Sequence, residues 1–371
     1  MSIGSATAYA GIWFASKGLS PEQIGFINST PVFALLLINI FVGKVADRAS
    51  DWRQTIIAGA WLAAICALGL FFAHSFWPIM AGWALVSIAQ GSIGPVMDAA
   101  ASRLTSRRGS SFGSLRAWGT IGFVFAIFLT GQLVTFAGGD VFIPLFIALG
   151  LLRALISLIL PRFKDAGGPS VKAEGMATHI LHMMKPWLFA PLLAWATIQS
   201  TNMTLIVFQS LMWKQQGLSA GLISNLIALG AIAEAAMMFA APWLKRHFRA
   251  RQLILIAGLT AAFRLACFAL SPGMPWLIPL QLLHAVTYAV GYLGCMQFIT
   301  RWTADEMAAE AQGFLVVIQQ VVVMLAYTAF GYLMTSYGAS AYFASAAMAL
   351  VGSAVVVGSM LFLPPPGTAK A

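Results

Sequence analysis

Residues 24–48 read IGFINSTPVFALLLINIFVGKVADR, in which twenty mostly apolar residues are followed by a short charged segment. An α-helix rises about 1.5 Å per residue, so twenty residues are enough to cross the hydrocarbon core of a bilayer, which is about 30 Å thick. Lipid offers no hydrogen-bond partner to the backbone, whereas a helix satisfies its own backbone groups. This stretch therefore predicts a transmembrane helix that ends in a basic loop.

The same pattern recurs along the whole chain. Of the 371 residues, 60% are hydrophobic and 9% are charged, whereas roughly a quarter of an ordinary globular chain is charged. We therefore expect an all-α integral membrane protein. Residues 1–16 are apolar but too short to cross the bilayer, and we expect them to be the second half of a truncated first helix, which makes twelve helices. The eleven complete spans are predicted at 24–43, 54–74, 77–98, 112–135, 141–160, 186–212, 220–244, 252–271, 276–300, 311–335 and 341–363.

The longest polar stretch divides the twelve expected helices into two groups of six. It covers residues 161–185 and contains the sequence GGP at 167–169, which is typical of a linker. We predict an N-terminal six-helix half at 1–160, with its first helix incomplete, and a C-terminal six-helix half at 186–371.

The two halves also resemble each other in sequence. Residues 18–20 and 217–219 both read GLS, and KVADR at 44–48 has a basic counterpart, KRHFR, at 245–249. A repeat of six helices is the architecture of alternating-access carriers, which bind their solute between the two halves. Chance similarity within apolar sequence is the alternative interpretation.

Lysine and arginine residues gather in alternate connections between the spans. One set of connections, together with the carboxyl end, holds sixteen of them, whereas the opposite set holds only Lys17 and Lys214. The positive-inside rule places the richer set in the cytoplasm. We expect a multi-pass protein of a bacterial-type inner membrane, with both termini cytoplasmic in the full-length form.

Composition also disfavours several classes of function. The net charge is +10, but the basic residues lie in short clusters between spans, as in membrane loops, so nucleic acid is not an expected partner. The three cysteines lie inside apolar spans without metal-ligand spacing, and no metal, disulfide or cofactor is expected. The five histidines are scattered and no catalytic constellation is visible, which argues against a membrane enzyme.

Ionisable side chains inside the spans are the candidates for function. A charge near the bilayer centre costs about 2.5–3.5 kcal/mol on insertion scales, so it persists where it is paired or useful. A histidine is included because its charge changes near neutral pH. The residues concerned are Asp98, Arg116, Arg153, Glu234, Arg264 and His284, of which Arg153 is expected to have a structural role.

The loop after the first complete span carries a recognisable motif. Residues 43–48 read GKVADR, which resembles the G-x-x-x-D-R loop signature of the major facilitator superfamily. The resemblance implies a twelve-helix fold in two halves, with Gly43, Asp47 and Arg48 acting as a conformational latch on the cytoplasmic side. A solvated loop that serves only topology is the alternative.

A second motif lies at the start of the fifth helix. Residues 111–123 read SFGSLRAWGTIGF, which resembles the F-G-x-x-R-x-[WF]-G segment of the lactose permease and phenylpropionate permease branch. That branch has an acidic residue 18 positions before the arginine, where this chain has Asp98. The resemblance implies that Asp98 and Arg116 hold the substrate and that Phe123 stacks on it. A salt bridge that closes the cytoplasmic gate is the alternative.

The second half matches the same branch at three positions. Glu234 on the eighth of the twelve expected helices, Arg264 on the ninth and His284 on the tenth resemble its proton-coupling cluster. The sugar carriers have a titrating glutamate three residues after the histidine, whereas this chain has Thr287. We therefore expect Glu234 to carry the proton, with a fixed Glu-Arg pair between helices as the alternative.

The segment GLSPEQIG at 18–25 resembles the corresponding loop of the phenylpropionate permeases most closely. This resemblance implies a proton symporter for a small aromatic carboxylate, functional as a monomer in the lipid bilayer. Arginine can grip a carboxylate with two hydrogen bonds, and Phe123 and Tyr288 offer ring contacts. A sugar or nucleoside symporter and a drug efflux carrier are the alternatives.

Overall fold

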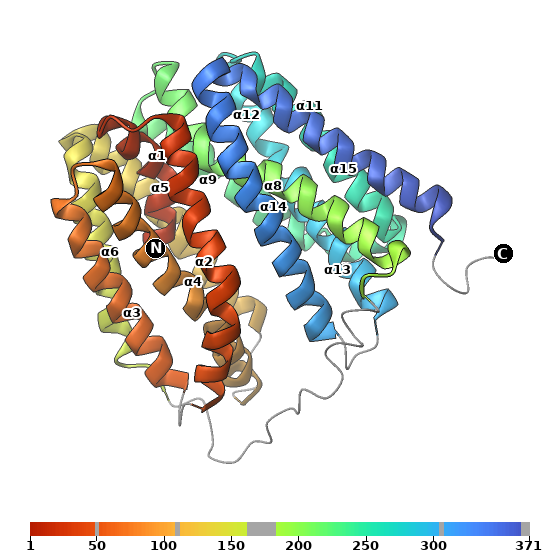
Figure 1. The fold of residues 1–371 in the computed structure, drawn as a ribbon, viewed down its shortest axis with the longest axis horizontal. Coiled ribbons are helices and arrows are strands. Elements are labelled where there is room, and N and C mark those ends of the chain that lie inside the picture. The colour runs from red at the N-terminus through yellow and green to blue at the C-terminus, as the bar shows by residue number, and fades with distance from the viewer. Residues whose placement is uncertain (49–51, 108–111, 162–182, 304–307, 365–371) are drawn as a thin grey trace. The chain divides into compact units, whose positions relative to one another are not determined.

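The computed structural model describes residues 1–48, 52–107, 112–161, 183–303 and 308–364. These residues are almost entirely helical and contain no strand (Figure 1). Each of the eleven predicted spans is occupied by one helix or by two or three helical segments in succession, so the predicted all-α class is confirmed.

The first six helical segments follow one another without a long break. The 15 residues of α1 would extend about 22 Å at the usual rise, which is less than the hydrocarbon core. The segments are α1 (Ser2–Ser16), α2 (Pro21–Arg48), α3 (Trp52–Gly69), α4 (Phe76–Arg107), α5 (Phe112–Ala137) and α6 (Phe142–Ser157).

Six further segments form the rest of the described chain, and two of them are composite. The segments are α8 (Pro186–Gln215), α9 (Ala220–Phe239) with α10 (Ala241–His247), α11 (Ala250–Ala269), α12 (Met274–Leu282) with the π-helical turn η3 (Val286–Val290) and α13 (Gly291–Trp302), α14 (Ala308–Tyr337) and α15 (Tyr342–Phe362).

Contacts along the chain define two compact units. The first consists of Met1–Lys172 and Trp213–Asn225, and the second consists of Ala173–Met212 and Leu226–Ala371. The end of α8 and the start of α9 therefore group with the first unit.

The outer surface of these helices is as apolar as the surface of a lipid-embedded protein. Phe72, Phe136 and Phe239 are 78%, 85% and 87% exposed, which water would oppose but hydrocarbon does not. Eight segments among the described residues are long and apolar enough to cross a membrane.

The repeated GLS sequence forms the same turn in both places. Gly18 and Gly217 have positive φ angles of 78° and 87°, a conformation that favours glycine. The residue after each glycine donates its backbone N–H to the carbonyl five residues before it, at 3.2 and 3.0 Å, which closes the preceding helix. The serine that follows accepts a hydrogen bond from the backbone N–H three residues later, at 3.2 and 3.3 Å. The sequence repeat is therefore also a structural repeat.

A second structural repeat involves two arginines that the sequence placed only as topology signals. At the start of α3, Nη2 of Arg53 donates to the carbonyl of Leu158 at the end of α6, at 2.5 Å. At the start of α11, Nη1 of Arg251 donates to the carbonyls of Ser359 and Leu363 at the end of α15. Because the last carbonyls of a helix lack partners within it, each arginine ties the third helix of its half to the sixth.

Two spans that the sequence analysis predicted as continuous are interrupted near prolines. The span at 220–244 divides at Ala240, because Pro242 lies in the first turn of α10 and has no N–H to continue the α9 ladder. The span at 276–300 contains Pro279 and then the π-helical turn η3.

Candidate functional site

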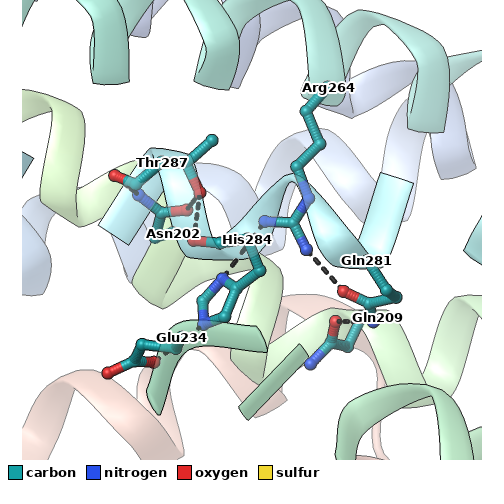
Figure 2. A network of polar contacts seen from close by, with 7 residues as sticks. All are labelled: Asn202, Gln209, Glu234, Arg264, Gln281, His284 and Thr287. Carbon is teal, nitrogen blue, oxygen red and sulfur yellow. Dashed lines mark hydrogen bonds and ion pairs between the residues drawn. The ribbon is translucent and has the colours of Figure 1, made fainter. Parts of the chain in front are cut away.

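Three helical segments of the second unit bring Glu234, Arg264 and His284 together (Figure 2). Glu234 lies on α9, Arg264 on α11 and His284 just after α12. Nε2 of His284 is 3.3 Å from Oε2 of Glu234, and Nδ1 of His284 is 3.3 Å from Nη1 of Arg264. The sequence therefore identified three side chains that gather in space, and their role in coupling stays a prediction.

Arg264 is buried among neutral acceptors. The residue is 1% exposed. Its Nε donates to the carbonyl of Leu280 at 2.7 Å, and its Nη2 donates to Oε1 of Gln281 at 2.5 Å. Glu234 reaches Arg264 only through His284, so the described side chains do not form the direct Glu-Arg pair considered from the sequence. These acceptors stabilise a charge that would otherwise be expensive to bury.

The contacts of His284 define its tautomer. A guanidinium has donors and no acceptor, so Nδ1 of His284 must accept from Arg264 and carry no proton. The proton of the neutral ring then lies on Nε2, which donates to the carboxylate of Glu234. His284 therefore links a buried cation to a carboxylate while remaining neutral itself.

Two buried amides extend this group, and the sequence reasoning missed both. Nε2 of Gln281 donates to Oε1 of Gln209 on α8, at 3.2 Å. Gln209 and Gln281 are nearly inaccessible. A buried amide needs hydrogen-bond partners. Glutamines inside apolar spans, one of them three residues before His284, could therefore have indicated that these two side chains belong to the polar group.

Aromatic rings continue from His284 along the same segment. The ring of Tyr288 lies 5.8 Å from that of His284, and the ring of Tyr292 lies 6.5 Å from that of Tyr288, nearly parallel to it. Tyr288 is half-buried and Tyr292 is exposed. Phe123, the other predicted ring contact, is half-buried on α5 in the first unit.

The remaining predicted residues lie on helices of the first unit. Asp98 falls on α4 and Arg116 on α5, and Gly43, Asp47 and Arg48 fall in the last turns of α2. Their side chains lie outside the described part of the structure.

Thr287 occupies the position where the sugar carriers have a carboxylate. It is fully buried, and its Oγ1 donates to Oδ1 of Asn202 on α8 at 2.9 Å. The same amide returns a bond, because Nδ2 of Asn202 donates to the carbonyl of Thr287 at 3.3 Å.

Comparison with known proteins identifies the family. The model of the family described as "MFS_1 like family" matches residues 1–322. The chain belongs to this family.

Several relatives and solved structures resemble this member of the MFS_1 like family. The "Probable 3-phenylpropionic acid transporter" of Escherichia coli (strain K12) is 27% identical over 89% of each chain. The "Maltose permease" of Geobacillus stearothermophilus is 25% identical over 79% of this chain and 74% of that protein. A crystal structure of the nucleoside transporter NupG has a TM-score of 0.80 at 17% identity, over 97% of this chain and 96% of that chain, a likeness that concerns the fold alone.

The family and the fold together define the class of protein. The chain is a multi-pass membrane protein with the twelve-helix fold of the major facilitator superfamily, and it is a secondary transporter rather than an enzyme. The repeated turns and arginine contacts are a structural repeat within the chain, and the division into two six-helix halves stays a prediction. The group formed by Glu234, Arg264 and His284 is therefore a candidate site for binding a proton or a solute.

Proposed function

We propose that this protein is a proton symporter that imports a small aromatic carboxylate, such as 3-phenylpropionate, by alternating access. The observation that carries the proposal is the chain of contacts from Arg264 through His284 to Glu234. In this proposal the protein works as a monomer in a bacterial inner membrane, with both termini in the cytoplasm.

Glu234 is the member of the group that carries the proton. It is 29% exposed, compared with 13% for His284, and Arg264 holds Nδ1 of His284 in its unprotonated form. A hydrogen bond to a carboxylate is roughly twice as strong as a bond between neutral groups. Protonation of Glu234 therefore weakens the link between α9 and the segment that carries His284, and release of the proton restores it.

Four side chains are proposed to hold the substrate. In this proposal Arg116 grips the carboxylate with its planar guanidinium, which a point charge would do less well. Asp98 holds the substrate together with Arg116, and Phe123 and Tyr288 provide ring faces for an aromatic substrate. The 27% identity with the probable 3-phenylpropionic acid transporter supports this substrate class.

The latch residues serve the conformational cycle rather than binding. Gly43, Asp47 and Arg48 end α2, where the positive-inside rule puts the cytoplasm. We assign them to closing the cytoplasmic side.

A sugar or nucleoside symporter is the second candidate. The observation in its favour is the similarity to the maltose permease and, at 24% identity over 82% of this chain, to the "Putative nucleoside transporter YegT" of Escherichia coli (strain K12). A drug efflux carrier differs from both in the direction of transport.

Uptake by proteoliposomes tests the proposal directly. Purified protein is reconstituted, and accumulation of labelled 3-phenylpropionate is measured with and without a pH gradient that is acidic outside. We expect accumulation that depends on the gradient, that a protonophore abolishes, and that excess uridine or maltose does not inhibit. Uptake of uridine or maltose with none of phenylpropionate would favour the second candidate.

A further inference from the structure

The helix that carries His284 loses its regular geometry immediately after that residue. The turn η3 (Val286–Val290) is π-helical, and Pro279 in α12 has already removed one backbone donor. A π-helical turn contains more residues than an α-helical turn and therefore rotates every later side chain about the helix axis. Such turns are rare and occur frequently at functional sites.

Asn202 on α8 contacts this turn through two reciprocal hydrogen bonds, which Figure 2 places beside His284. Its Nδ2 donates to the backbone carbonyl of Thr287 at 3.3 Å, and its Oδ1 accepts from Oγ1 of Thr287 at 2.9 Å. A carbonyl can only accept, so the amide nitrogen must face it, and the amide oxygen must face the hydroxyl. Asn202 is 3% exposed and Thr287 is 0% exposed, so water does not compete for these bonds.

A second residue of α8 supports the other end of the same turn. A Cβ atom on Gly291 would lie 2.1 Å from Cζ3 of Trp195, so only glycine allows the two helices to approach this closely. Trp195 is fully buried and precedes Asn202 by two helical turns, on the same face of α8. The π-helical turn is therefore held by α8 at both ends.

We propose that Asn202 and Thr287 are positioning residues that hold the π-helical turn so that His284 lies between Arg264 and Glu234. The inference rests on the proposed function, in which Glu234 binds the proton. Thr287 stands where the sugar carriers have a carboxylate, and here its hydrogen bonds with Asn202 position His284.

The surroundings of His284 show why its position matters. The titratable and charged side chains that face it are Glu234 from α9, Arg264 from α11 and Tyr288 from its own segment. Both of its ring contacts to charged groups are 3.3 Å long, so a small rotation of the turn breaks one of them. The Thr287 hydroxyl also lies 3.2 Å from the carbonyl of His284, but its single proton serves the shorter bond to Asn202.

Infrared titration of the full-length protein in membranes tests this inference without any substrate. The carboxylic acid band of Glu234 is identified by its loss in Glu234→Gln, and its titration midpoint is then compared between variants. Thr287→Val keeps the shape of the side chain and removes the hydroxyl, whereas Thr287→Ser keeps the hydroxyl. Thr201→Val is the matched control, because the fully buried Thr201 donates only to Ile198 of its own helix, at 2.7 Å.

We expect Thr287→Val to displace the midpoint by about half a pH unit or more, equivalent to about 0.7 kcal/mol. We expect Thr287→Ser and Thr201→Val to leave the midpoint in place. An unmoved midpoint in Thr287→Val, or an equal displacement in Thr201→Val, overturns the positioning role alone. A Glu234 band that does not respond to pH overturns the proposed function instead, and with it the reason for the pair.

Asn202→Ala provides a second route if Thr287→Val does not fold. If two residues act only through each other, the double variant displaces the midpoint no further than either single variant does. Asn202→Ala is therefore expected to displace the midpoint as Thr287→Val does, with no further displacement when both are present. Additive displacements would show that the two residues act separately and would overturn the inference.

Discussion

Replacing Glu234 with glutamine separates the binding of substrate from its coupling to protons. Glutamine has the shape of protonated glutamate but cannot release a proton. Exchange of internal for external substrate requires no net proton movement, whereas accumulation requires the proton to leave in the cytoplasm. We therefore expect Glu234→Gln to retain exchange and to lose accumulation.

The size of each effect follows from the contacts of Glu234. Nε2 of His284 donates to Oε2 of Glu234 at 3.3 Å, and glutamine replaces this bond to a charged group by one between neutral groups. Such a replacement loses about 1 kcal/mol, so the exchange rate should fall by no more than about tenfold. Accumulation behaves differently, because one proton per substrate supports about tenfold accumulation for each pH unit, or 1.36 kcal/mol, and the variant should equilibrate without any accumulation.

The assay uses one preparation of proteoliposomes for both measurements. Labelled 3-phenylpropionate is followed first as exchange against an internal pool and then as uptake driven by a pH gradient of about one unit. Asp140→Asn is the matched control, because Asp140 is an exposed carboxylate between α5 and α6. Undiminished accumulation in Glu234→Gln would refute the assignment and direct attention to Asp98 or His284.

Three further substitutions test other parts of the structure. Arg116→Lys keeps the charge but loses the planar fork, so we expect substrate affinity to fall about tenfold or more in a binding assay, with normal membrane expression. Gly291→Ala drives a methyl group into Trp195, and we expect a loss of about 1–3 kcal/mol, measured as a lower thermal unfolding midpoint in detergent. Arg251→Gln shortens the side chain and removes the guanidinium that donates to the end of α15, and we expect a loss of about 1–3 kcal/mol by the same measurement.

Each of these substitutions has a contrary outcome, and the two that test stability have a control variant. Full substrate binding by Arg116→Lys would exclude Arg116 from the site. Gly358→Ala is the control for Gly291→Ala, because a Cβ at Gly358 meets nothing within 4 Å, and equal losses in both would contradict the packing argument. Arg246→Gln is the control for Arg251→Gln, because Arg246 is exposed, and an unchanged midpoint in Arg251→Gln would show that the helix ends are held by other contacts.

The helical fold could be predicted from the sequence because lipid leaves the backbone little choice. Each apolar span of about twenty residues must satisfy its own hydrogen bonds, and a helix does so. The cost of charge inside apolar spans marked Glu234, Arg264 and His284 as candidates, and the resemblance to the permease branch implied that the three belong together. The prediction of the helices rests on free energies large enough to outweigh local detail.

The interruptions and the supporting contacts could not be predicted in the same way. A π-helical turn differs from an α-helical turn by a small change in register, and Val286–Val290 is as apolar as its neighbours. The bonds of Asn202 to Thr287 join residues 85 positions apart, and no local pattern announces such a pair. Arg53 and Arg251 were interpreted as topology signals, because the positive-inside rule accounts for their position but not for the carbonyls that they contact.

The net charge of the buried group in the second unit connects the proton to an anionic substrate. With Glu234 ionised, its charge cancels that of Arg264, because the ring between them is neutral. Protonation of Glu234 leaves the group with a net charge of +1 in a medium of low dielectric, where charges interact strongly over long distances. In the proposed cycle, a protonated transporter therefore attracts a carboxylate more strongly than an unprotonated one. Glu234→Gln holds the group permanently in the +1 state, which is why that variant should bind and exchange its substrate while failing to concentrate it.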